Sequence, residues 1–353
     1  MKKIVMSLIA LTVVAAMAAP AVADYKFYGS VRMMTFWKTV DPPKGDSDSD
    51  LVWDLQSNSR FGLRAKTGDI AGRIEYGTGV NLRLLYATWS FDGGTLLLGQ
   101  TYNPYTFFSD QAANADWGFL GYGALYDGRK PQIKISLNNG FYVSAITPTT
   151  STLGIDEDSD GKTSPDVDTI LPKLAAGYKF KVQNVKANVG AAFQTFDVKG
   201  ENGVFDDTIT SWLLYVNATT MVGPATLKAT VHYGQNLGDF GLVFLNKSQK
   251  TAASAVVGTK SIWYTTSYGG FVQAGFKAAD NVKVVAGLGY ACFDNETYKD
   301  PDAEMSFFVQ APITIAKTFF VVPEFSYFDG MDDAAGNEES DTWYLGAKWQ
   351  MNF

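Results

Sequence analysis

The stretch Trp343–Phe353, WYLGAKWQMNF, alternates between two kinds of side chain over its whole length. Successive side chains of an extended strand point to opposite faces, so this stretch has two different faces. One face is apolar and carries Trp343, Leu345, Ala347, Trp349, Met351 and Phe353; the other carries Tyr344, Gly346, Lys348, Gln350 and Asn352. Terminal residues are usually poorly ordered and exposed to water, which is unfavourable for a chain that ends on an aromatic side chain. We therefore expect this strand to be held in a sheet.

Residues 1–23 have the pattern of a secretory signal peptide: a basic start, an apolar run over 4–19 and the small-residue cleavage site Ala21-Val22-Ala23. We expect the mature chain, residues 24–353, to form a single domain. It has no apolar run of about eighteen residues, the length that a membrane-spanning helix needs. Any membrane crossing must therefore use strands.

The composition fits a barrel wall between lipid and water. Charged residues make up 18% of the chain and aromatic residues 14%, and the mean hydropathy is −0.05. These values are too polar for a helical membrane protein and low in charge for a soluble one. A strand with lipid on one face and a water-filled lumen on the other averages to such a hydropathy.

Alternation of apolar and polar residues recurs in sixteen segments, each about as long as a tilted strand needs to cross the membrane. They lie at 25–38, 51–66, 70–77, 80–91, 95–102, 129–138, 141–148, 170–182, 185–197, 208–222, 225–235, 262–277, 281–292, 304–315, 318–328 and 342–353. Tight turns such as Gly223-Pro224 alternate with long polar connections such as 149–169. This asymmetry predicts an all-β fold: a sixteen-stranded antiparallel transmembrane β-barrel with short periplasmic turns and longer extracellular loops. The last strand must pair with the first, because an open edge in lipid leaves backbone groups without partners.

Two stretches resemble the Gram-negative general porins, which are trimeric outer-membrane proteins. They are SNSRFGLRAKTGDIAGRIEY (57–76) and RLLYATWSFDGGTLLLGQTYNPY (83–105). The resemblance implies sixteen strands, a homotrimer, and a third long loop, here residues 103–128, that folds into the lumen as a constriction. The chain departs from that family in its very short second loop, near Gly77–Gly79, and in its loop motif, where Asp116-Trp117-Gly118-Phe119 is the nearest match to Pro-Glu-Phe-Gly-Gly.

Strand parity places a group of arginines on the wet face of the first four strands. The basic wall consists of Arg32, Arg60, Arg64, Arg73 and Arg83. Guanidinium groups stay protonated, so such a cluster requires counter-charges, and the third loop offers Asp110, Asp116 and Asp127. A basic wall opposite an acidic loop would set ion preference at the constriction. The alternative is that these arginines are ordinary solvated lumen residues.

Acidic residues are concentrated in the predicted extracellular loops, and the formal net charge is −7 before the signal peptide with Lys2 and Lys3 is removed. An acidic rim attracts cations, could share divalent ions with lipopolysaccharide, and excludes nucleic acid as a partner. Asp156, Asp158 and Asp160 match the first half of a calcium loop, but Val167 stands where a bidentate Glu is needed. A solvated acidic loop is the alternative explanation.

Two functional classes remain. One is a porin for the passive diffusion of ions and small hydrophilic solutes, with no cofactor. The other is a surface-binding or envelope-stabilising barrel whose lumen is blocked by loops. We do not expect an enzyme, because the only histidine, His232, has no recognisable nucleophile beside it. The third loop is rich in aromatic residues, which either stack on solutes such as sugars or pack the loop against the wall.

Overall fold

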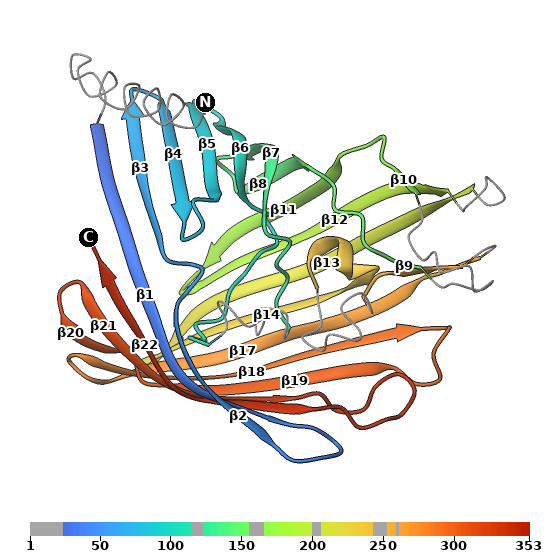
Figure 1. Cartoon of the computed structure of the whole chain (residues 1–353). Helices are drawn as coiled ribbons and strands as arrows, with labels where there is room; N and C mark the ends of the chain where they lie inside the picture. The colour runs from blue at the N-terminus through green and yellow to red at the C-terminus, as the bar shows by residue number, and fades with distance from the viewer. Residues whose placement is uncertain (1–23, 114–122, 155–165, 200–205, 243–252, 259–260) are drawn as a thin grey trace, which may run out of the picture.

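The structure is a computed structural model that describes residues 24–113, 123–154, 166–199, 206–242, 253–258 and 261–353. The described residues form a closed antiparallel β-barrel of sixteen wall strands (Figure 1). This confirms the predicted fold class. No helix in these ranges is long and apolar enough to cross a membrane.

The wall strands follow one another around the barrel in chain order. Two of them are interrupted, so that β2 with β3, and β19 with β20, each form one wall strand. In order, the segments are β1 (Asp24–Asp41), β2 (Asp48–Leu55), β3 (Arg60–Thr67), β4 (Ile70–Gly77), β5 (Leu82–Phe91), β6 (Gly94–Tyr102), β7 (Arg129–Leu137), β8 (Phe141–Ile146), β11 (Lys173–Val182), β12 (Val185–Lys199), β13 (Asp206–Val222), β14 (Ala225–Gln235), β17 (Thr265–Ala279), β18 (Val282–Asn295), β19 (Asp302–Gln310), β20 (Ile313–Ala316), β21 (Phe319–Asp329) and β22 (Asp341–Asn352).

The barrel closes between its first and last strands, as predicted. Ser30–Asp41 of β1 pair with Asp341–Asn352 of β22. Gly29 and Phe353 add two backbone hydrogen bonds of 2.8 and 3.1 Å. A Cβ at Gly29 would lie only 2.2 Å from the Phe353 ring, so a side chain there would displace this terminal ring. The seam leaves neither edge strand unpaired.

The two faces of the wall differ as strand parity predicts. In β22, Leu345, Trp349 and Met351 point outward and are 50%, 42% and 54% exposed, whereas Tyr344 points into the bore and is buried. The same alternation places exposed Val143 and buried Ser144 on opposite faces of β8. The outer surface is therefore an apolar belt, and the polar side chains of the wall strands face the bore.

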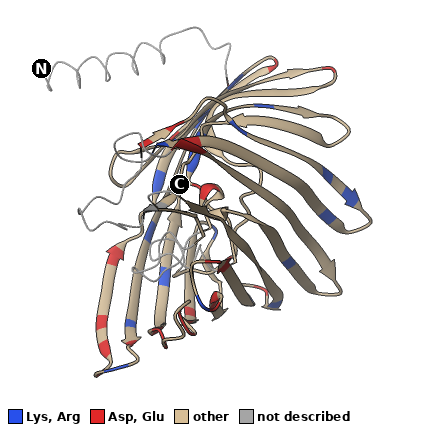
Figure 2. Cartoon of the chain, turned by 90° about the vertical axis from the view of Figure 1, so that its right-hand side faces the viewer, with Lys and Arg blue, Asp and Glu red and all other residues tan. Residues whose placement is uncertain are grey.

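The connections at the two ends of the barrel also differ in length. Tight turns such as Thr67–Ile70 and Val222–Ala225 use Gly68 and Gly223, which have φ angles of 55° and 56° that suit glycine. Longer loops join the strands at the other end, and acidic residues are frequent there (Figure 2).

Parts of three long loops fold together inside the bore. We call residues 103–128 the third loop, 147–172 the fourth and 236–264 the sixth. The sixth loop contains a 3₁₀ turn, η3 (Leu237–Phe240), which lies within the barrel (Figure 1). A small sheet inside these loops joins β9 (Thr152–Gly154), β15 (Ala255–Val257) and β16 (Ile262–Trp263), while β10 (Asp166–Asp168) pairs with β12.

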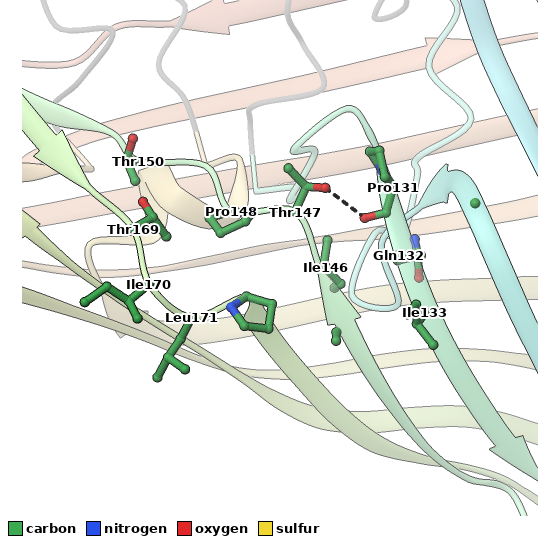
Figure 3. Close-up of a pocket in the computed structure, with 13 residues that line it drawn as sticks. Pro131, Gln132, Ile133, Ile146, Thr147, Pro148, Thr150, Thr169, Ile170 and Leu171 are labelled. Atoms are coloured by element: carbon green, nitrogen blue, oxygen red, sulfur yellow. Dashed lines mark hydrogen bonds between the residues drawn. The ribbon is translucent and has the colours of Figure 1, made fainter.

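Where the fourth loop leaves the wall, it opens a groove of about 750 Å³ between residues 147–150 and 169–172 (Figure 3). β8 ends at Ile146 and β11 begins at its register partner, Lys173. Thr147 still donates from its backbone N–H and its hydroxyl to the carbonyl of Pro131, at 3.0 and 3.2 Å. Beyond this point the chain turns inward, which positions the fourth loop over the lumen-facing side of β11 to β13.

Candidate functional site

A cavity of about 890 Å³ lies in the bore between the third loop and the wall. We call it the basic cavity because of the charged side chains that line it: Arg32 on β1, Arg60 on β3, Arg83 on β5, Arg129 on β7, Lys283 on β18 and Lys348 on β22. Within the described residues, Asp110 is the only carboxylate in its lining. The electrostatic potential in this part of the bore is therefore positive.

Glu75 on β4 holds the arginine cluster together. Its carboxylate accepts hydrogen bonds from Arg73 Nη2 at 2.7 Å, Arg83 Nε at 2.9 Å and the Tyr28 hydroxyl at 2.9 Å, and Arg60 Nη1 lies 3.6 Å away. Glu75 is fully buried. This single buried carboxylate offsets much of the repulsion between three guanidinium groups, so the wall itself supplies a counter-charge.

The predicted basic wall is divided by the structure. Arg32, Arg60 and Arg83 line the basic cavity. Arg64 and Arg73 do not; they are cross-strand partners, and their guanidinium carbons lie 4.9 and 5.1 Å from the Tyr28 ring centre. Both groups point into the barrel, but parity does not report how far along the bore each side chain lies.

The third loop crosses the bore and is fixed to the opposite wall. Asp110 accepts hydrogen bonds from Lys228 Nζ at 3.1 Å and Gln273 Nε2 at 2.6 Å. The buried carboxylate of Glu324 accepts from the backbone N–H groups of Ala112 and Ala113 at 2.5 and 2.9 Å. These contacts fix Asp110 and Ala112, which line the basic cavity.

The other predicted loop acids lie elsewhere. Asp116 is outside the described residues, as are Asp156, Asp158 and Asp160 of the calcium hypothesis. Asp127 does not line the basic cavity. Its carboxylate accepts from Lys173 Nζ at 2.6 Å and Thr149 Oγ1 at 2.7 Å. No cluster of three or more His, Cys, Asp or Glu side chains in the described part of the chain is placed to hold a metal ion.

Lys173 joins three loops at one buried point. Besides its ion pair with Asp127, it donates to the backbone carbonyl of Asp239 in η3. The Asp239 carboxylate accepts from Ser211 Oγ at 2.5 Å and from the Ser151 N–H at 2.7 Å. This network therefore ties the third, fourth and sixth loops to β11 and β13.

An apolar layer covers the wall around this network. The inward faces of β8, β11, β12 and β13 form what we call the apolar flank, and the inward faces of β1, β3, β4, β5 and β22 form the charged flank. Ile146, Ala175, Ala192, Leu213 and Tyr215 of the apolar flank are buried beneath loop residues Tyr105, Leu125, Leu237, Phe240, Leu242 and Ala253. Folded loops thus fill this side of the bore, and the basic cavity occupies the other.

Three cations of the basic cavity were absent from the predicted basic wall. Lys348 lies on the polar face of the terminal strand, so parity alone could have added it. Arg129 and Lys283 stand at or next to the first residues of their strands. At such positions the strand pattern has barely begun, and the sequence gives little signal for a lumen-facing side chain.

A closed barrel with a charged cavity in its bore has the architecture of an outer-membrane channel. A family model described as Gram-negative porin matches residues 10–258, more than half of the chain. The chain therefore belongs to the Gram-negative porin family, which confirms the resemblance of residues 57–76 and 83–105. The protein is an outer-membrane channel protein.

Solved structures of other outer-membrane proteins share the fold. The channel DcaP of Acinetobacter baumannii is 19% identical, with a TM-score of 0.73 over 95% of this chain and 99% of that one. The anion-selective porin from Comamonas acidovorans is 16% identical, with a TM-score of 0.61 over 94% and 100%. OmpT of Vibrio cholerae is 16% identical, with a TM-score of 0.57 over 95% and 99%. No curated protein matches the sequence.

Proposed function

We propose that the protein is a passive diffusion pore for ions and small hydrophilic solutes, with a preference for anions. The observation that carries this is the lining of the basic cavity, which contains six cationic side chains and one carboxylate among the described residues. Ions crossing a narrow bore sample the nearest fixed charges, so cations are repelled and anions concentrated there. The solved porin from Comamonas acidovorans with the same fold is described as anion-selective.

The test is the reversal potential of the purified protein in a planar bilayer with a potassium chloride gradient. We expect the sign of an anion-preferring pore, and Arg32→Ala should reduce the preference because it removes a charge from the cavity. Arg64→Ala is the matched control, since its guanidinium stacks over Tyr28 and does not line the cavity. Cation preference in the wild-type protein, or equal shifts in the two variants, would refute the proposal.

A second candidate function is a surface-binding or envelope-stabilising barrel with a blocked lumen. It is favoured by the sixth loop, which buries Leu237, Phe240 and Leu242 inside the bore. Single-channel recording separates the two functions, because a blocked barrel that is correctly folded gives no discrete current steps.

We further propose that the protein assembles as a homotrimer in contact with outer-membrane lipid and lipopolysaccharide. Support for the assembly comes from the OmpT structure, one form of which is described as a trimer. Support for the lipid contact comes from the exposed apolar side chains of the outer wall, such as Phe27, Trp89 and Val231. Crosslinking of the protein in native membranes tests the assembly, and a monomeric product alone would contradict it.

A further inference from the structure

The aromatic side chains in the described part of the third loop and its flanks fall into two groups. The first group packs against the wall and other loops. Tyr105 is buried, with its ring centre 6.1 Å from Tyr215 and 5.9 Å from Phe240. Phe107 stacks on Phe271 of β17 at 5.8 Å with an interplanar angle of 8°. These rings hold the loop in place and do not line the basic cavity.

The second group lines the basic cavity. Tyr102, Phe108 and Tyr126 form a cluster with ring centres 5.4 to 6.3 Å apart, and all three are only partly buried. The lining also contains four apolar residues from other parts of the wall: Val285, Pro312, Phe320 and Val322. The cavity thus combines aromatic and aliphatic surface with polar and cationic side chains. Such apolar surface favours contact with a flat apolar group.

Cations stand directly beside the aromatic cluster. The Arg129 guanidinium carbon lies 5.8 Å from the centre of the Tyr102 ring, and Arg83 Nη2 donates to the Tyr102 hydroxyl at 3.3 Å. Arg129 Nη1 is buried and has no hydrogen-bond partner among the described residues. Arg129 also lines the cavity, and a carboxylate is the acceptor that matches the planar geometry of a guanidinium group.

We propose that the basic cavity contains a binding subsite for small aromatic carboxylates. The ring of the solute lies against Phe108 and Tyr126, and its carboxylate accepts a hydrogen bond from Arg129. This inference rests on the proposed pore function and names a solute class for the same cavity. Neutral sugars fit the cavity less well, because they add no negative charge to a lining with six cations and one carboxylate. Simple aliphatic acids supply the charge but do not use the aromatic surface.

The test is block of single-channel chloride current by added solutes at fixed ionic strength. We expect benzoate to reduce the current at lower concentrations than acetate, and benzyl alcohol to have no effect. Phe108→Ala should raise the half-blocking benzoate concentration by about three- to tenfold, the range that one aromatic contact contributes. Phe107→Ala is the matched control, because the neighbouring ring stacks on Phe271 away from the cavity.

The outcomes separate this inference from the pore function itself. Equal block by benzoate and acetate, block by benzyl alcohol, or equal effects of the two Phe variants would overturn the subsite. The chloride reversal potential of Phe108→Ala should stay at the wild-type value, since no charge is removed. Loss of anion preference in the wild-type protein would instead refute the pore proposal, whatever benzoate does.

Discussion

The charged flank and the apolar flank of the bore belong to the same barrel and obey the same strand parity, yet their environments are opposite. On the charged flank, Arg32 and Arg60 border a cavity. On the apolar flank, Leu213 and Ile209 are completely buried beneath loops. Inward-facing residues of a barrel are therefore not all lumen residues. One side of this interior contains a buried apolar cluster, and the other side contains the basic cavity.

This comparison explains why the loops can stay inside a water-filled barrel. A loop with only polar residues could leave the wall at little cost in free energy, because water would replace its hydrogen bonds. The sixth loop instead buries Phe240 and Leu242 against apolar wall positions, which gives it the stabilisation of a protein core.

The largest effect is expected for Leu213→Asp on the apolar flank. It places an unpaired carboxylate where the side chain is fully buried, at a cost of about 4 kcal/mol in the free energy of unfolding. Unfolding by urea in lipid vesicles, followed by tryptophan fluorescence, measures this. Gln350→Asp is the control, because Gln350 lines the basic cavity opposite Arg32 on the neighbouring strand. Similar unfolding midpoints for the two variants would mean that water reaches the side chains of the apolar flank.

A second large effect is expected for Lys173→Met. The substitution leaves the buried carboxylate of Asp127 with only Lys130 Nζ, 3.6 Å away, as a cationic partner, which weakens the packing of the three loops by about 3 kcal/mol. We expect larger single-channel conductance and more frequent fluctuations, because the loops leave the apolar flank. Adding Asp127→Asn should restore part of the wild-type behaviour, since it removes the buried charge that Lys173 no longer compensates.

Lys134→Met provides the control for this experiment. Lys134 is a partly buried lysine on β7 and takes part in no ion pair among the described residues. The substitution Lys134→Met removes one positive charge, as Lys173→Met does, but it breaks no contact with a loop in the described part of the chain. Should both variants show the same conductance change, the loss of charge rather than the release of the loops would be its cause.

On the charged flank of the barrel, Glu75→Gln should lower the free energy of unfolding by about 2 kcal/mol. The loss is smaller than that expected from breaking a fully buried ion pair, because two of the three arginines around Glu75 are partly exposed. The substitution should also increase anion preference, since the cluster gains net positive charge. Urea unfolding and reversal potentials measure the two effects. Asp54→Asn serves as a comparison at an exposed acid on β2, and neither quantity should change much there.

The smallest effect is expected from pH. Burial raises the pKa of Asp239 in η3 to about 7 from an ordinary value of 3.8. Ser211, the Ser151 N–H, Lys173 and Asp127 surround this carboxyl. Because the folded loop holds the proton more tightly than the unfolded chain, its packing is most stable below about pH 4 and loses this contribution as pH rises to about 7.

Current fluctuations of the wild-type pore should therefore be rarer at acidic than at neutral pH. Asp239→Asn should lose this dependence. A pH profile that is identical in the variant would assign the effect to other groups.

Most of the wall was predictable from the sequence, because strand periodicity is a local signal. The sixteen predicted segments correspond to the sixteen wall strands, and the polar face of Trp343–Phe353 does face the bore. The division between the two flanks was not predictable. Ile209 and Leu213 look like neutral lumen positions until the sixth loop is placed over them.

The site shows the same limit. Parity placed Arg32 and Arg64 on one face, but only the register of β1 with β3 and β22 sets their depth in the bore. Asp127 was assigned to the constriction by its position in the third loop. Its partner, Lys173, is 46 residues away along the chain, and no local pattern connects the two.

The seam between β1 and β22 also has a kinetic meaning. Its partners, such as Met33 and Trp349, are separated by nearly the whole chain, so this pairing has the largest loop-closure cost of any in the wall. Every other wall strand pairs with its neighbour in sequence and can assemble as a growing curved sheet. The barrel closes only when β1 pairs with β22, and we expect this pairing to be the slow step of insertion.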